Sequence, residues 1–223
     1  MIVVHHLNYS RSQRILWLLE ELGLPYEIRR YQRDAATMLA PPELRAVHPL
    51  GKSPVVTDGD VTVAESGAII EYLVDQYGNG RLKPAAATEA RRRYTYWLHY
   101  AEGSAMSPLL FKLVFDRIDA TPMPFFAKPI ARQITSKVQG RFIVPNLKLH
   151  LDYLESELAH ADWFAGPEIT AADIQLSFPI ELARVRAGLD ESRPRLMDFL
   201  RRIHARPAYQ AALTRAGDYS LLR

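Results

Sequence analysis

The hydrophobic pattern of this chain changes near residue 80, and this change restricts the possible folds more than any other feature. Before it, short β-branched runs alternate with two segments of helical spacing, residues 11–22 and 65–77. The last two runs flank Asp58-Gly59, a hairpin turn signal. The order is strand, helix, strand, a stretch in which Pro41-Pro42 argues against a regular element, two strands and a helix. It predicts a mixed sheet with parallel and antiparallel pairs.

Strand signals end beyond residue 80. Residues 81–87, which include Lys83-Pro84, are typical of a linker. Helical patterns then run through 88–115, 128–159, 170–187 and 193–205, with a short helix expected after Pro207. We therefore predict an α/β domain over residues 1–80, a linker over 81–87 and an all-helical domain over 88–223.

The 223 residues include no cysteine, which excludes disulfides, thiolate metal sites and a thiol nucleophile in the protein itself. The formal net charge is only +3, and the basic residues are spread along the chain, which argues against nucleic-acid binding. The seven histidines lack metal-ligand spacing, so we predict no metal. Neither a signal-peptide pattern nor an apolar run of about 18 residues is present, and we expect a cytoplasmic protein that does not bind membranes.

The first candidate site is the turn between the opening strand and its helix, residues 7–14. Hydroxyl side chains stand there beside a helix start, where free N–H groups and the positive dipole end favour an anion. A thiol bound at this point would have its thiolate stabilised, and a hydroxyl donor would add a hydrogen bond to the sulfur. The alternative is that Ser10 only caps the helix.

The second candidate site is Lys52-Ser53-Pro54, directly before a strand. A cis Pro54 would fix a sharp turn and expose the backbone of Ser53, which can pair with an extended peptide. Lys52 can meet a carboxylate there. The alternative is an ordinary trans turn that enters an edge strand.

The third candidate site is Glu65-Ser66 before an apolar helix. Ser66 and the helix amides can bind a carboxylate, while Glu65 can accept from an ammonium group. One end of an amino acid carries both charges, so the pair suits an α-amino-acid head. The alternative is an N-cap with an acidic first turn. Taken jointly, the three sites meet the needs of one tripeptide, glutathione.

Four motifs in this order resemble the cytosolic glutathione transferase superfamily, in a bacterial-type, serine-like and cysteine-free form. They are SRSQRILWLLEELGLPYE at 10–27, HPLGKSPVV at 48–56, ESGAIIEYL at 65–73 and ITAADI at 169–174. The resemblance implies a thioredoxin-like N-terminal domain that binds glutathione, and an all-α C-terminal domain. It also implies that Thr170 and Asp173 form a buried capping box with a folding role. The match is poor over residues 105–140.

The resemblance also implies roles for the individual residues. Lys52 faces the glycyl carboxylate, the Ser53 backbone before Pro54 pairs with the cysteinyl portion, and Glu65 with Ser66 holds the γ-glutamyl head. Ser10 is our choice for the residue that activates the thiol, because it fits the family's serine pattern with Arg14 four positions later. Tyr9 takes this role if the alignment slips by one residue, and Asn8 is a further polar contact to the sulfur.

The second substrate, a hydrophobic electrophile, should contact the helical domain. We choose Tyr100 and Phe111 as pocket-lining residues, with interdomain core packing as the alternative for these aromatics. The resemblance implies a detoxifying glutathione transferase, with organic hydroperoxide reduction as a secondary activity, and a homodimer. The rival interpretation is a non-catalytic relative that binds ligands or proteins through the same fold.

Overall fold

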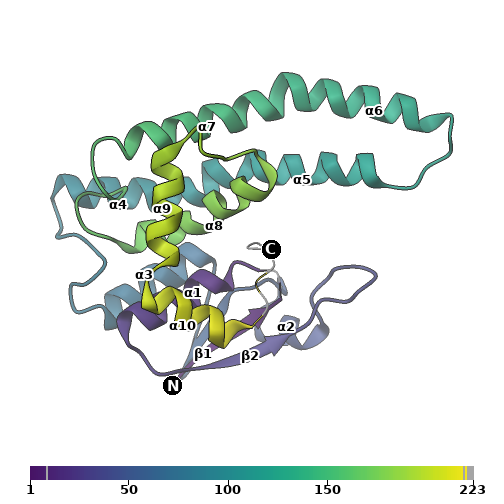
Figure 1. Ribbon diagram of the computed structural model, residues 1–223. Coiled ribbons are helices and arrows are strands. Elements are labelled where there is room, and N and C mark those ends of the chain that lie inside the picture. Colours follow the sequence, from purple (N-terminus) through teal and green to yellow (C-terminus); the bar gives the residue numbers. More distant parts are fainter. Residues whose placement is uncertain (9, 218, 220–223) are drawn as a thin grey trace.

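The computed structural model describes residues 1–8, 10–217 and 219, and it begins with a four-stranded sheet (Figure 1). The strands are β1 (Ile2–Leu7), β2 (Tyr26–Tyr31), β3 (Val55–Asp58) and β4 (Val61–Ala64), in the spatial order β2-β1-β3-β4. β1 runs parallel to β2 and antiparallel to β3, and β3 pairs antiparallel with β4. The predicted mixed, thioredoxin-like sheet is confirmed.

Three helices accompany the sheet: α1 (Ser12–Leu22), α2 (Pro42–Val47) and α3 (Ser66–Tyr77). The apolar stripe of α1 is completely buried, which follows from its helical spacing of leucine and isoleucine. α2 corrects the expectation that Pro41-Pro42 prevents a regular element. Pro42 takes the first position of this helix, where a missing N–H costs nothing, and Leu44 packs on Leu7 and Tyr31.

The second half of the chain is helical, as predicted. Its elements are α4 (Glu89–Tyr100), a π-helical turn (Ala101–Ala105), α5 (Met106–Ala120), α6 (Ala127–Val138), a second π-helical turn (Gln139–Ile143), α7 (Val144–Glu157), α8 (Ala171–Arg186), α9 (Pro194–His204) and α10 (Pro207–Ala216). The ends of α5 and α6 extend together beyond the rest of the molecule (Figure 1). No helix among the described residues is long and apolar enough to span a membrane.

The last helix, α10, leaves the helical layer and packs against α1 (Figure 1). Arg206 pairs with Glu21 at the end of α1, and the guanidinium of Arg215 stacks over the ring of Tyr26. Buried residues of both halves form one continuous hydrophobic cluster. The two halves therefore share a core.

The start of α8 carries the predicted capping box. Asp173 Oδ2 accepts hydrogen bonds from the backbone N–H of Thr170 at 2.8 Å and from its hydroxyl at 2.9 Å. Asp173 Oδ1 accepts from the backbone N–H of Phe164 at 2.9 Å. The carboxyl is completely buried, and burial raises its pKa to about 6. This box joins the loop before α8 to the helix itself.

Candidate functional site

A cavity of about 420 Å³ lies where β1 ends and α1 and α3 begin. It brings together the residues predicted for the thiol, the peptide backbone and the amino-acid head, although they come from three separate segments. Those predicted residues are Ser10, Lys52, Ser53, Pro54, Glu65 and Ser66. The remaining wall includes the charged side chains Arg11, Arg33, Arg45 and Glu102.

Ser10 lies just before α1, in contact with two other hydroxyls. Its Oγ is 2.7 Å from Ser12 Oγ and 3.2 Å from Ser53 Oγ, and it accepts from the Ser12 N–H at 3.3 Å. Ser53 donates its own proton to the His5 carbonyl at 2.8 Å, so it cannot also donate to Ser10. Arg11 is the N-cap residue of α1, and it makes no side-chain capping bond. The Ser10 oxygen therefore accepts from the first amide of α1, as a capping group does, while its proton can still be donated.

His6 continues this chain of hydroxyls on the buried side. Its Nδ1 lies 2.7 Å from Ser12 Oγ. Burial, with a smaller contribution from Arg30 on the neighbouring strand, lowers the pKa of His6 to about 4, so the ring is neutral at pH 7. When Nδ1 carries the ring proton, it donates to Ser12, and Ser12 donates to Ser10. In this polarity the nearest acceptor of the Ser10 proton is Ser53 Oγ at 3.2 Å, and a sulfur bound in the cavity would compete for that proton.

Asn8 and Tyr9 are the other predicted residues of this turn. Asn8 Oδ1 accepts from the backbone N–H of Arg33 at 2.9 Å, and the Asn8 carbonyl accepts from Arg33 Nε at 3.1 Å. Asn8 thus ties the turn to the segment after β2, and it is not part of the cavity wall. Tyr9 lies outside the described residues.

The segment before β3 forms a second wall of the cavity. The peptide bond between Ser53 and Pro54 is cis, so the cis alternative is the one that the structure has. Ser53 Oγ also accepts from the Leu7 N–H at 3.2 Å, which fastens this segment to the end of β1. Lys52 is exposed at the cavity, where its ammonium group can meet an anion.

The N-terminus of α3 forms a third wall. Glu65 is its N-cap residue and has φ 71°, a positive value that is uncommon for a residue other than glycine. Such conformations are found more often at binding and active sites. Ser66 begins the helix and is buried, and no side-chain cap occupies the helix start. The free N–H groups there can receive a carboxylate.

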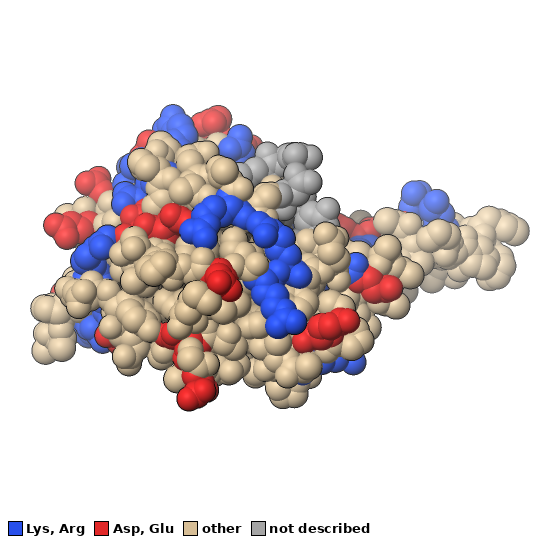
Figure 2. Space-filling model, turned by 90° about the horizontal axis from the view of Figure 1, so that it is seen from below, with Lys and Arg blue, Asp and Glu red and all other residues tan. Residues whose placement is uncertain are grey.

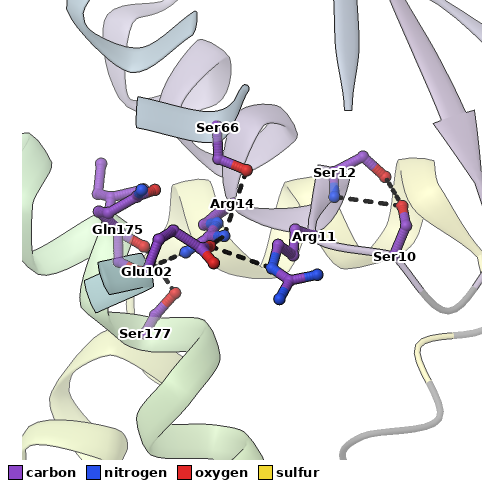
Figure 3. A network of polar contacts seen from close by, with 9 residues as sticks. Ser10, Arg11, Ser12, Arg14, Ser66, Glu102, Gln175 and Ser177 are labelled. Atoms are coloured by element: carbon purple, nitrogen blue, oxygen red, sulfur yellow. Dashed lines mark hydrogen bonds and ion pairs between the residues drawn. The ribbon is translucent and has the colours of Figure 1, made fainter. Parts of the chain in front are cut away.

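A buried arginine joins this wall to the helical half (Figure 3). Arg14, only 2% exposed, donates to Ser66 Oγ at 3.2 Å and to the Gln175 carbonyl of α8 at 2.6 Å, and it forms an ion pair with Glu102. Glu102 also accepts from Arg11 Nε at 3.1 Å. Burial acts to raise the pKa of Glu102, but the two guanidiniums outweigh it and hold this pKa below its usual range. A carboxylate charge is thus fixed at the edge of the cavity.

A second cavity, of about 570 Å³, adjoins the first and shares Arg11, Arg33, Met38 and Lys52 with it. Its other walls come from α5 and α8 and are largely apolar. They consist of Met106, Leu109, Leu110, Leu113, Arg117, Phe178, Leu182 and Arg186.

The two residues predicted for a second-substrate pocket do not line this cavity. Tyr100 is buried among aromatics at the end of α4 and bonds to His150 Nδ1 at 2.5 Å. Phe111 is exposed and packs edge-to-face on Phe142. Tyr100 takes the packing role that was the alternative. Phe111 takes neither role, because it lies off the face of α5 that carries Met106, Leu109 and Leu113 to the cavity.

Sequence reasoning missed several charged and polar residues of the site. Glu102, Arg117 and Arg186 stand in segments with no local motif, and only tertiary packing brings them to the cavities. His6 and Ser12 carried a weak signal, since both lie within six residues of Ser10 in a strand–turn–helix unit. Lysine and arginine side chains form a curved band on the face that Figure 2 shows, which favours the approach of anions to that face.

Comparison with known proteins gives two family matches. Residues 1–75 match "Glutathione S-transferase, N-terminal domain", and residues 127–202 match "Glutathione S-transferase, C-terminal domain". The chain is 38% identical to Glutathione S-transferase 3 of Schizosaccharomyces pombe over 99% of this chain and 90% of the relative. It is 32% identical to Glutathione S-transferase 1 of Saccharomyces cerevisiae, over 97% of this chain and 95% of the relative.

Solved structures agree with these matches. A glutathione S-transferase from Actinobacillus pleuropneumoniae superposes with a TM-score of 0.82 at 35% identity, and the match covers 100% of this chain and 96% of the other. A sphingomonad glutathione S-transferase complexed with glutathione has a TM-score of 0.70 at 25% identity, over 97% of this chain and 100% of the other.

Proposed function

The chain belongs to the cytosolic glutathione transferase superfamily, and from this membership we propose that Ser10 activates the glutathione thiol for attack on an electrophilic small molecule. Its activity is that of a glutathione S-transferase. One observation carries the assignment of the site: the residues expected for the thiol, the backbone and the amino-acid head line a single cavity of about 420 Å³.

The three walls suit the three parts of glutathione. Lys52 binds the glycyl carboxylate, and the Ser53 backbone pairs with the cysteinyl residue. The free amides at the start of α3, with Ser66, bind the γ-glutamyl carboxylate. Glu65 and Glu102 accept from the ammonium group of the γ-glutamyl residue. The ion pairs of Glu102 with Arg11 and Arg14 support this role for Glu102, because they keep its carboxylate ionised.

Thiol activation follows from stabilising the thiolate more than the thiol. A free thiol has a pKa of about 8.5, so only a few per cent is ionised at pH 7. Each pKa unit corresponds to about 1.4 kcal/mol. The Ser10 hydrogen bond and the positive end of α1 together supply about one to two units. The contacts to Ser12 and Ser53 support this role, since both hold the Ser10 oxygen beside the α1 start.

The electrophile binds in the apolar cavity between α5 and α8, in place of the pocket that Tyr100 and Phe111 were expected to form. The sulfur attacks its electrophilic carbon and forms an S–C bond. The bond to the leaving group breaks, and that group departs with its electron pair. The thiol proton has already left to solvent when the thiolate forms.

The test combines calorimetric titration with glutathione and conjugation rates with 1-chloro-2,4-dinitrobenzene for wild type, Ser10→Ala and Tyr9→Phe. We expect Ser10→Ala to lose at least tenfold in kcat while it keeps its affinity for glutathione. Greater damage by Tyr9→Phe would move the activating role to Tyr9. A wild-type protein that does not bind glutathione would favour the non-catalytic scaffold.

Three further predictions of the resemblance are tested separately. A homodimer predicts twice the chain mass in light scattering, and a cytoplasmic location predicts recovery in the cytosolic fraction. Reduction of cumene hydroperoxide at the cost of two glutathione molecules, with oxidised glutathione, alcohol and water as products, would establish the secondary activity.

A further inference from the structure

We propose that the second substrate has an apolar body that carries a carboxylate, and that Arg117 and Arg186 bind this carboxylate. The inference rests on the proposed function, because it assigns the substrate class of the cavity between α5 and α8. It follows from which residues line that cavity and from their charges.

The second cavity combines apolar walls with arginine and lysine and with no acidic side chain. Seven apolar residues and five cationic residues line it. Its volume of about 570 Å³ is that of a site for a small organic molecule. A neutral apolar substrate would offer no anion to the cations of this wall, whereas an apolar molecule with one carboxylate would use both kinds of wall.

Three of the five cations also belong to the first cavity. Arg11, Arg33 and Lys52 line both cavities, so they can act on glutathione itself. Arg11 is bonded to Glu102, and Arg33 donates to the backbone carbonyls of Asn8 and Met38. Arg117 and Arg186 line only the second cavity, and glutathione does not account for them.

Arg117 projects from α5 and Arg186 from the end of α8, so two separate helices bring positive charge to one cavity. Neither forms an ion pair within residues 1–8, 10–217 and 219. Asp116 is the acid whose charge reaches Arg186, and Lys112 already holds both of its oxygens, at 2.6 and 2.7 Å.

The guanidiniums at this cavity also act on one another. Burial, and then repulsion by Arg117, lower the pKa of both Arg33 and Arg186. Repulsion between like charges costs free energy, and a carboxylate bound between them lowers that cost. Guanidinium groups suit such a partner because they can bind a carboxylate with two parallel hydrogen bonds.

The experiment compares two electrophiles that differ by one carboxylate, 4-chloro-3,5-dinitrobenzoate and 1-chloro-2,4-dinitrobenzene. For each electrophile, kcat/KM is divided by the rate constant of its uncatalysed reaction with glutathione. The carboxylate preference is this quotient for the benzoate divided by the same quotient for the neutral compound. We expect a wild-type preference of at least tenfold that declines as salt is raised, because a charge-assisted hydrogen bond is involved. Arg117→Gln and Arg186→Gln should each lower this preference about tenfold.

Arg132→Gln is the matched control, since Arg132 is exposed on α6 and does not line either cavity. It should keep the wild-type preference. A wild-type preference of one or less overturns the inference, as does a preference that Arg117→Gln and Arg186→Gln leave unchanged.

A binding measurement separates this outcome from failure of the proposed function. Calorimetric titration with 3,5-dinitrobenzoate and with neutral 1,3-dinitrobenzene requires no turnover. If neither chloro compound reacts, the transferase assignment fails. Tighter binding of the benzoate, lost in Arg186→Gln, would still support the carboxylate site, and equal binding of the two compounds would reject it.

Discussion

The side-chain oxygens of Ser10 and Ser12 lie 2.7 Å apart at the start of α1. Only one of the two hydroxyls can donate in this contact. When Ser12 donates, the Ser10 proton can be given to Ser53 Oγ at 3.2 Å or to a sulfur bound in the cavity. His6 Nδ1 completes the chain at 2.7 Å from Ser12. If Ser10 activates the thiol as proposed, Ser12 is a positioning residue for it.

Ser12→Ala should raise the pKa of the bound glutathione thiol by about half a unit to one unit, because one hydrogen bond to Ser10 contributes about 1 kcal/mol. The rise should be smaller than in Ser10→Ala. Ultraviolet absorbance of the thiolate against pH, with the site saturated, measures it. Ser12→Thr keeps the hydroxyl and should titrate like wild type. Identical curves for Ser12→Ala and wild type would remove Ser12 from the mechanism.

His6 should make stability depend on pH. Its folded pKa of about 4 lies below its unfolded value of 6.5, so the unfolded chain binds the proton more tightly. The neutral His6 ring therefore contributes its full stabilisation above pH 6.5, and this stabilisation is lost as the pH falls towards 4. The 2.5-unit difference between 6.5 and 4 corresponds to about 3 kcal/mol.

Urea unfolding of wild type and His6→Asn at several pH values between 4 and 7 tests this expectation. The asparagine amide keeps a hydrogen-bonding group near Ser12 but does not titrate. The variant should lose less stability than wild type as the pH falls. If both proteins lose the same stability between pH 7 and pH 4, groups other than His6 cause the loss of stability in acid.

Glu102→Gln should lower the free energy of unfolding by about 3 kcal/mol, because it leaves the buried charge of Arg14 without a carboxylate. Arg11→Gln removes only the half-exposed pair with Glu102 and should cost less than about 1 kcal/mol. Urea denaturation measures both variants. Equal losses would mean that the Arg14 pair contributes no more than an ordinary surface ion pair.

The capping box of α8 predicts unequal effects for its two members. Asp173→Ala leaves several buried donors without an acceptor and should cost about 3 kcal/mol. Thr170→Ala removes one capping hydroxyl and should cost about 1 kcal/mol. The conjugation rate per folded molecule should change little in both. Equal destabilisation by Asp173→Ala and Thr170→Ala would contradict the larger contribution expected of Asp173.

Local motifs made most of the first domain and half of the site predictable. Ser10, Pro54 and Ser66 each stand at a strand or helix end, where a few neighbouring residues determine the geometry. Glu102 meets Arg14 across 88 positions of sequence, and no local pattern reports such a contact. Tyr100 does not line the second cavity, because it packs on other aromatic side chains such as Tyr153, a tertiary contact that the sequence near Tyr100 does not report.

Arg14 has a consequence for how such a protein can be divided or recombined. Its guanidinium belongs to α1, but two of its three acceptors, Glu102 and the Gln175 carbonyl, come from helices of the other half. A chimera that keeps residues 1–80 and borrows foreign helices inherits a buried cation without its acceptors. The N-terminal half is thus no portable module, and helices grafted onto it must supply a carboxylate at the position of Glu102.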